Sequence, residues 1–133
     1  MATHPFNSIL RLSKVVGESE NYGTEQEHLN SVFGARLRIT SLHAVAGPGV
    51  ELLEYLAPRN GHPYPQEAHT NDLYSWQTKL VVPDADQAAL ILRQQKYRLV
   101  SSSVVAISES EVEQGKSFLV RDPDGHVIQV IEK

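Results

Sequence analysis

The chain has 133 residues, enough for one domain with a substantial core and too few for two domains of ordinary size. With 41% hydrophobic and 21% charged residues its composition is globular, and the net charge of −4 gives no basic surface for nucleic acid. The absence of cysteine excludes disulfides and thiolate-ligated zinc. No apolar run approaches the ~18 residues of a membrane span, and the first residues lack the pattern of a secretory signal. We therefore expect a cytoplasmic protein that binds neither nucleic acid nor membranes.

Three strands are predicted in the first half of the chain. They cover residues 15–19 (VVGES), 36–44 (RLRITSLHA) and 50–54 (VELLE), with a Gly-Pro-Gly turn at residues 47–49 between the last two. A polar connector follows over residues 57–70, where three prolines favour an extended path over a helix.

The second half of the chain begins with a strand and a helix. Residues 76–82 (WQTKLVV) alternate between two faces as a strand does. Pro83 ends this strand, and Asp84 is a favourable N-cap for a following helix. The helix has one apolar stripe at the i, i+3, i+4, i+7 spacing, formed by Ala85, Ala88, Ala89 and Leu92.

Three further strands are predicted to complete the second half. The first covers residues 97–106 (YRLVSSSVVA), which are rich in β-branched and aromatic residues, and a polar loop covers residues 108–116. Residues 117–121 (SFLVR) and 126–132 (HVIQVIE) are predicted to form a hairpin around the Asp-Pro-Asp-Gly turn of residues 122–125. Proline presets one backbone angle of that turn, and glycine accepts a positive φ.

The two halves of the chain form a divergent repeat. The Ile-Leu-Arg of residues 9–11 recurs at residues 91–93, and VELLE parallels IQVIE near the C-terminus, which places Glu51 opposite Gln129. Only eight residues precede Ile9, too few for a strand and the first turns of a helix. The first copy is therefore predicted to begin inside its helix, without its opening strand.

These features resemble the vicinal oxygen chelate superfamily, which includes glyoxalases, bleomycin-resistance proteins and extradiol dioxygenases. The family pattern is a strand opening with His or Gln, a helix capped by Pro and Asp, and a hairpin around a DPDG turn. Here it is carried by residues 76–86 (WQTKLVVPDAD) and 118–132 (FLVRDPDGHVIQVIE). The first half matches from residues 21–34 to residues 49–58, so the resemblance covers nearly the whole chain.

The resemblance implies an α+β fold in a single domain, residues 1–133. In that fold, paired βαβββ modules form a curved mixed sheet around a cavity, and here the first module lacks its opening strand. Module one would cover about residues 5–57, the connector residues 58–72 and module two about residues 73–133.

The resemblance also implies candidate metal ligands. Family metal sites take one ligand from the first strand and one from the last strand of each module. Those positions hold Glu51, Gln77 and Gln129 here, and the first-strand position of module one has no counterpart. Two of the three are neutral amides, which are weaker donors than histidine or carboxylate. Either no metal or a divalent ion such as Mn, Fe, Ni, Zn or Mg is compatible with this set.

The period of the strands predicts which side chains line the cavity. The predicted lining consists of Glu51, Leu53, Tyr55, Gln77, Lys79, Val127, Gln129 and Ile131. A concave apolar surface with a few polar groups suits a small molecule. His28, in the segment EQEHLN, is a candidate acid/base or ligand above the cavity, although a surface-loop histidine is the commoner case.

The weak ligand set favours a protein that binds a small, largely apolar or aromatic molecule without transforming it, as resistance-type members of the family do. One alternative is a metal-dependent lyase, isomerase or dioxygenase acting on a substrate with vicinal oxygens, where the metal is a Lewis acid. Another is an oligomerisation module with an unused cavity. Because a missing strand would leave a sheet edge bare, we also expect a homodimer.

Overall fold

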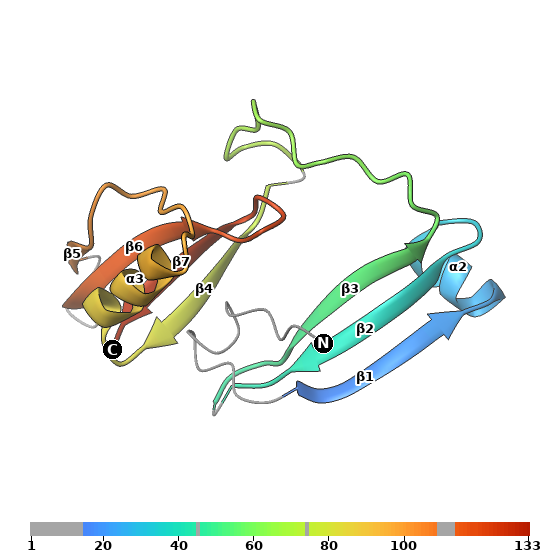
Figure 1. Ribbon diagram of the computed structural model, residues 1–133, viewed down its shortest axis with the longest axis horizontal. Coiled ribbons are helices and arrows are strands. Elements are labelled where there is room, and N and C mark those ends of the chain that lie inside the picture. The colour runs from blue at the N-terminus through green and yellow to red at the C-terminus, as the bar shows by residue number, and fades with distance from the viewer. Residues whose placement is uncertain (1–14, 45, 74, 109–113) are drawn as a thin grey trace. The chain divides into compact units, whose positions relative to one another are not determined.

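The chain folds into two units, which we call the N-terminal unit, ending at His62, and the C-terminal unit, beginning at Pro63 (Figure 1). The boundary falls within the connector predicted over residues 57–70. The helix predicted near residues 9–11 lies outside the described residues. So do the residues before it, where the opening strand was predicted to be missing. The described helices include none long and apolar enough to cross a membrane. The computed structural model describes residues 15–44, 46–73, 75–108 and 114–133.

The N-terminal unit contains a three-stranded antiparallel sheet in the order β1-β2-β3. β1 is Val15–Tyr22, β2 is Arg36–Leu42 and β3 is Val50–Ala57, which confirms the three strands predicted from the sequence. The helix α2, Thr24–Asn30, connects β1 to β2 and was not predicted. Its seven residues make about two turns at the ideal of about 3.6 residues each, and its buried residue is the polar Gln26. No apolar stripe therefore marks it in the sequence.

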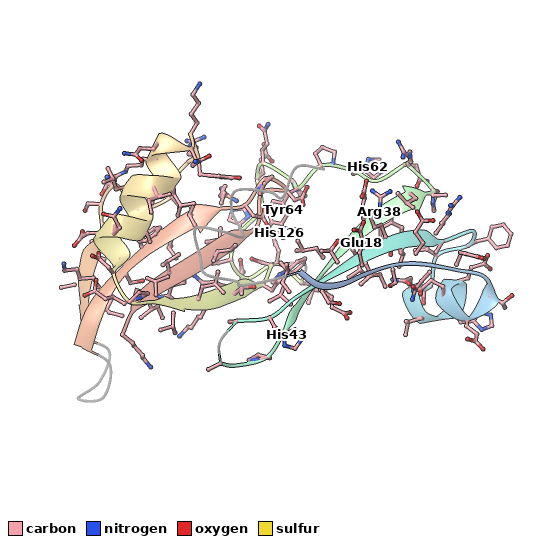
Figure 2. The ribbon with its side chains drawn as sticks, turned by 60° about the horizontal axis from the view of Figure 1, so that its bottom comes forward. Glu18, Arg38, His43, His62, Tyr64 and His126 are labelled. Atoms are coloured by element: carbon pink, nitrogen blue, oxygen red, sulfur yellow. The ribbon has the colours of Figure 1, made fainter. Side chains whose placement is uncertain are left out.

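Ion pairs hold one face of this sheet. On β2, Arg38 lies 3.3 Å from a carboxylate oxygen of Glu18 on β1 and 2.8 Å from one of Glu54 on β3 (Figure 2). Arg36 pairs with Glu20 at 2.7 Å, and this hydrogen-bonded guanidinium lowers the pKa of the Glu20 carboxyl. Exposed ion pairs contribute little one by one. These pairs nevertheless favour the observed register, because each joins neighbouring strands.

The C-terminal unit contains a four-stranded sheet in the order β4-β7-β6-β5, with β4 parallel to β7 and the other neighbours antiparallel. Its helix α3 lies against β6 and β7 on one face of the sheet (Figure 1). This confirms the predicted order of a strand, a helix and three strands. The elements are β4 Gln77–Val82, α3 Ala85–Gln94, β5 Val105–Ser108, β6 Gln114–Arg121 and β7 Val127–Glu132.

The helix α3 begins where the sequence predicts it. Oδ1 of Asp84 accepts a hydrogen bond from the backbone nitrogen of Gln87 at 2.9 Å and so caps the first turn. The contact between α3 and the sheet forms the core of this unit. Burying a side chain of leucine or phenylalanine size contributes about 1.5–3 kcal/mol to the free energy of unfolding. The stripe residues Ala85, Ala88, Ala89 and Leu92 are all buried, as are Phe118, Val120 and Val130 on the sheet.

The strand predicted over residues 97–106 is wrong for most of its length. Leu99 makes a single bridge to Val120, residues 100–103 bend, and the ladder resumes only in β5. The Oγ of Ser101 accepts a hydrogen bond from the backbone nitrogen of Leu119 at 2.8 Å. Because a serine hydroxyl here takes the place of a strand carbonyl, the regular ladder is interrupted.

The hairpin of β6 and β7 is confirmed, but β6 is longer than predicted. It begins at Gln114, within the predicted loop of residues 108–116, and residues 109–113 lie outside the described part. Oδ1 of Asp122 accepts from the backbone nitrogens of Asp124 and His126 at 3.0 and 2.8 Å. Gly125 has a φ of +100°, the positive value that the DPDG turn predicts.

Candidate functional site

One face of the C-terminal sheet carries the residues predicted for the site of module two. Side chains alternate along a strand, and the even-numbered residues of β7 include Val130, which is buried on the α3 side. The odd-numbered residues of β4 and β7 therefore occupy the opposite face, where Lys79 is in register with Gln129. We call this the α3-distal face. On these two strands it consists of Gln77, Lys79, Val81, Val127, Gln129 and Ile131.

Apolar and amide side chains make up most of the α3-distal face. At its two edges Val81 on β4 is 58% exposed and Val105 on β5 is 49% exposed, whereas Ile131 and Ser117 on the inner strands between them are buried. Between these two strands, Nε2 of Gln129 donates a hydrogen bond to Oγ of Ser117 at 3.3 Å. The face thus offers apolar surface together with a few hydrogen-bonding groups, the combination that small-molecule sites use.

The charge on the α3-distal face is positive. Lys79 is exposed on β4, and Arg121, at the end of β6, donates from Nη1 to the carbonyl oxygen of Gly125 at 2.5 Å. Within the four described strands β4, β5, β6 and β7 themselves, Glu132 is the one carboxylate, and it is directed to the α3 side. There its Oε2 accepts from the backbone nitrogen of Ala85 at 2.9 Å.

The residues predicted for the site of module one share a face of the N-terminal sheet. Glu51 is opposite Ser41, Leu53 is opposite Ile39, and Tyr55 lies two residues further along β3. All three are exposed, and Oε1 of Glu51 accepts a hydrogen bond from Oγ of Ser41 at 3.2 Å. Glu51 is therefore a carboxylate on an otherwise partly apolar face.

His28 lies on α2, at the end of the N-terminal unit. Its side chain is exposed, and it borders a shallow hollow. Phe33, on the rim of the same hollow, is 93% exposed, so the hollow encloses little. The lining residues are Glu27, His28, Ser31, Val32 and Phe33.

The candidate metal ligands do not fit a divalent transition metal well. Gln77 and Gln129 are on adjacent strands but two residues apart in register, since Gln129 is opposite Lys79. The amide of Gln129 already donates to Ser117, and Glu51 already accepts from a serine hydroxyl. Neutral amides attract Mn, Fe, Ni or Zn much less than imidazole or carboxylate does, so we derive no chemistry through such an ion.

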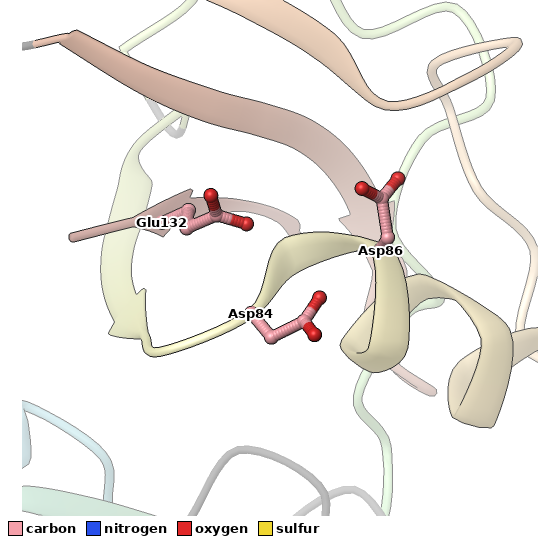
Figure 3. A group of neighbouring side chains, drawn as sticks. All are labelled: Asp84, Asp86 and Glu132. Carbon is pink, nitrogen blue, oxygen red and sulfur yellow. The ribbon is translucent and has the colours of Figure 1, made fainter.

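A second group of possible ligands was missed in the sequence. In the part of the chain that the structure describes, Asp84, Asp86 and Glu132 place ligand oxygens within 4.8 Å of one another (Figure 3). Oxygen-only sets of this kind suit hard cations such as Mg²⁺ and Ca²⁺. The group forms because β4 and β7 are parallel and in register at Val82 and Glu132, which brings the end of the chain beside the start of α3.

Each of these carboxylates already has a partner in the fold. Glu132 accepts from the first backbone nitrogen of α3, Asp84 caps the helix, and Asp86 forms an ion pair with Lys116. That contact raises the pKa of the Lys116 ammonium. Negative groups are stabilising at the positive end of a helix, so capping of α3 accounts for the group.

A separate aromatic group surrounds His126, after the DPDG turn. The Trp76 ring stacks on the His126 ring with centroids 4.3 Å apart, and Tyr64 meets it edge-on at 5.1 Å. Nδ1 of His126 lies 3.4 Å from Oδ2 of Asp122. The group joins the connector, the residue before β4 and the hairpin turn, so it anchors the connector to the C-terminal unit.

Comparisons with known proteins identify the fold. Neither the protein-family models nor the curated proteins give a match. Among solved structures, a glyoxalase family protein from Bacillus cereus matches with a TM-score of 0.72 and 20% identity, over 88% of this chain and 75% of that one. A member of the glyoxalase/bleomycin resistance protein/dioxygenase superfamily from Sphaerobacter thermophilus gives a TM-score of 0.49 and 11% identity, over 100% and 91% of the two chains. The first likeness confirms the glyoxalase-type fold that the sequence pattern predicted.

Proposed function

We propose that this chain, with its glyoxalase-type fold, binds a small, largely apolar or aromatic molecule on the α3-distal face of its C-terminal sheet. The observation that carries the proposal is the exposure of Val81 on β4 and Val105 on β5, at the two edges of a face that also carries the amides of Gln77 and Gln129. A ligand that covers these valines gains about 25 cal/mol per Å² of apolar surface removed from water.

The amides supply orientation in this proposal. Each glutamine amide has two N–H donors and one acceptor oxygen, and the contact with Ser117 holds the Gln129 side chain in place. A few fixed polar groups within an apolar surface give a binding site its specificity. Binding without chemistry agrees with the weak ligand set described above.

Paired variants test the position of the site. The probe is N-phenylnaphthylamine, a neutral aromatic dye that fluoresces on apolar surfaces. Val81→Asp places a charge on the α3-distal face and should weaken dye binding by about tenfold or more, because the carboxylate must be desolvated. Leu90→Asp is the matched control, because Leu90 is 49% exposed on α3, outside the proposed site. Equal affinities in the two variants would contradict the proposal, as would an unmodified protein that binds neither this dye nor its sulfonated analogue.

Metal content separates binding from metal-dependent catalysis. Protein purified without chelator is expected to contain no stoichiometric transition metal. Near-stoichiometric Mn, Fe, Ni or Zn that is lost in Glu51→Ala would contradict the binding proposal in favour of a metal-dependent enzyme.

We also propose that the protein forms a homodimer through its sheet edges. Among the described strands, β4 and β5 are the edges of the C-terminal sheet, and β1 and β3 those of the N-terminal sheet. Unprotected edge strands tend to pair with other chains, and a second copy presents the same edges. Light scattering should give the mass of two chains, and a clean monomer at high concentration would contradict this.

A further inference from the structure

On the described strands β4, β5, β6 and β7, the α3-distal face carries the exposed cation Lys79 and no anion. Lys79 lies on β4 between Gln77 and Val81, and its side chain is exposed. Ion pairs in the described part of the chain involve other cations: Lys116 pairs with Asp86, Arg36 with Glu20. Within the described residues, Lys79 therefore forms no ion pair with a neighbouring carboxylate.

A ligand that covers this face removes water from around the Lys79 ammonium. An apolar body over Val81 would remove water from the neighbouring ammonium, and burying a charge without a partner is costly. An anionic group on the ligand offsets that cost through a charge-assisted hydrogen bond, which is about twice as strong as a neutral one. A neutral ligand of the same shape gains only the apolar contact.

The amides of Gln77 and Gln129 also favour a ligand with an anionic group. Gln129 is directly in register with Lys79 and Gln77 is two residues before it on the same face, so both residues are neighbours of Lys79 there. One N–H of Gln129 donates to Ser117, and its second N–H remains for another acceptor. A carboxylate or sulfonate has several acceptor oxygens and can use an ammonium and an amide together.

Resting on the binding function proposed above, we infer that the ligand is an organic anion: an apolar or aromatic body with one acidic group, which pairs with Lys79 while the body covers Val81. Lys79 thereby determines specificity for the charge of the ligand, and the valines determine specificity for its apolar body.

Two dyes with the same aromatic body separate the charge from the body. Anilinonaphthalene sulfonate carries an acidic group, and N-phenylnaphthylamine lacks it. The full-length protein should bind the sulfonate about tenfold more tightly than the neutral dye, the factor that corresponds to one charge-assisted contact. Raising the salt concentration should weaken sulfonate binding and leave neutral-dye binding unchanged.

Lys79→Met should weaken sulfonate binding by about tenfold and leave the neutral dye unaffected. Lys96→Met is the matched control, because Lys96 is also an exposed cation but lies beyond the end of α3; it should change neither affinity. Far-UV circular dichroism checks that both variants are folded.

The outcomes distinguish the two proposals. If both dyes bind but Lys79→Met leaves sulfonate affinity unchanged, or lowers it no more than Lys96→Met does, the inference about an organic anion is overturned and the binding function stands. If neither dye binds the unmodified protein, the binding function itself is overturned.

Discussion

The two sheets correspond to the two copies of the predicted repeat but are stabilised differently. The C-terminal sheet has one face covered by α3, with Phe118, Val120 and Val130 almost completely buried. The N-terminal sheet has a face on which Arg38 connects carboxylates of both neighbouring strands at the protein surface. The N-terminal sheet also buries Leu37 and Leu42 on β2, but the described part of the C-terminal unit buries more apolar side chains and therefore has the larger core.

The two sheets also differ in the charge of the faces predicted to meet a ligand. In the N-terminal sheet that face carries Glu51, held by Ser41. In the C-terminal sheet the corresponding position is Gln129, and its in-register neighbour is Lys79. The C-terminal face thus has an amide beside a lysine where the N-terminal face has a carboxylate. The C-terminal face therefore favours anions, and the N-terminal face favours cations.

The largest expected effect tests the core of the C-terminal unit. Phe118→Ala should lower the free energy of unfolding by about 3–5 kcal/mol, because it leaves a cavity beneath α3. The chain has a single tryptophan, Trp76, so urea unfolding followed by its fluorescence reports on this unit. Leu90→Ala, at an exposed position of α3, should change the free energy of unfolding by no more than about 0.5 kcal/mol. Equal losses in the two variants would mean that α3 and the sheet do not form the core.

A smaller effect is expected at the cap of α3. Asp84→Ala should cost about 1 kcal/mol, since the backbone nitrogen of Gln87 loses its acceptor. Asp84→Asn should cost little, because asparagine caps a helix about as well as aspartate. Thermal unfolding by circular dichroism measures both. If the Asn variant lost as much as the Ala variant, the charge of the group with Asp86 and Glu132 would matter more than the cap.

The elements that could be predicted from the sequence have local causes. Asp84 and the apolar stripe that follows it lie within one short segment, and the structure confirms both the start of α3 and its buried face. The DPDG turn likewise depends only on its own residues, and Asp122 and Gly125 behave as their chemistry predicts. The same local signals, placed in a repeat, were sufficient to predict the glyoxalase-type fold.

The features that were missed depend on contacts between distant residues. The bend at Ser101 follows from a hydrogen bond to Leu119, 18 residues away in the chain. Glu132 reaches the start of α3 through a contact with Ala85 over 47 residues. Strand alternation did predict that Gln77, Lys79 and Gln129 share a face. Which described strands border that face, and that none of them adds a carboxylate to it, became clear only with the sheet order.

The smallest expected effect concerns the ion pairs of the N-terminal sheet. The guanidinium of Arg36 lowers the pKa of Glu20 in the folded state, so the folded protein binds that proton less tightly than the unfolded chain does. The pair therefore stabilises the fold above the ordinary pKa of glutamate, and this contribution is lost as the pH falls through the lower, folded-state value. Arg36→Met should raise the pKa of Glu20 towards its ordinary value in an NMR titration of the carboxyl carbon, and added salt should shift it in the same direction. Identical titration midpoints with and without Arg36 would show that the carboxylate of Glu20 is solvated rather than paired.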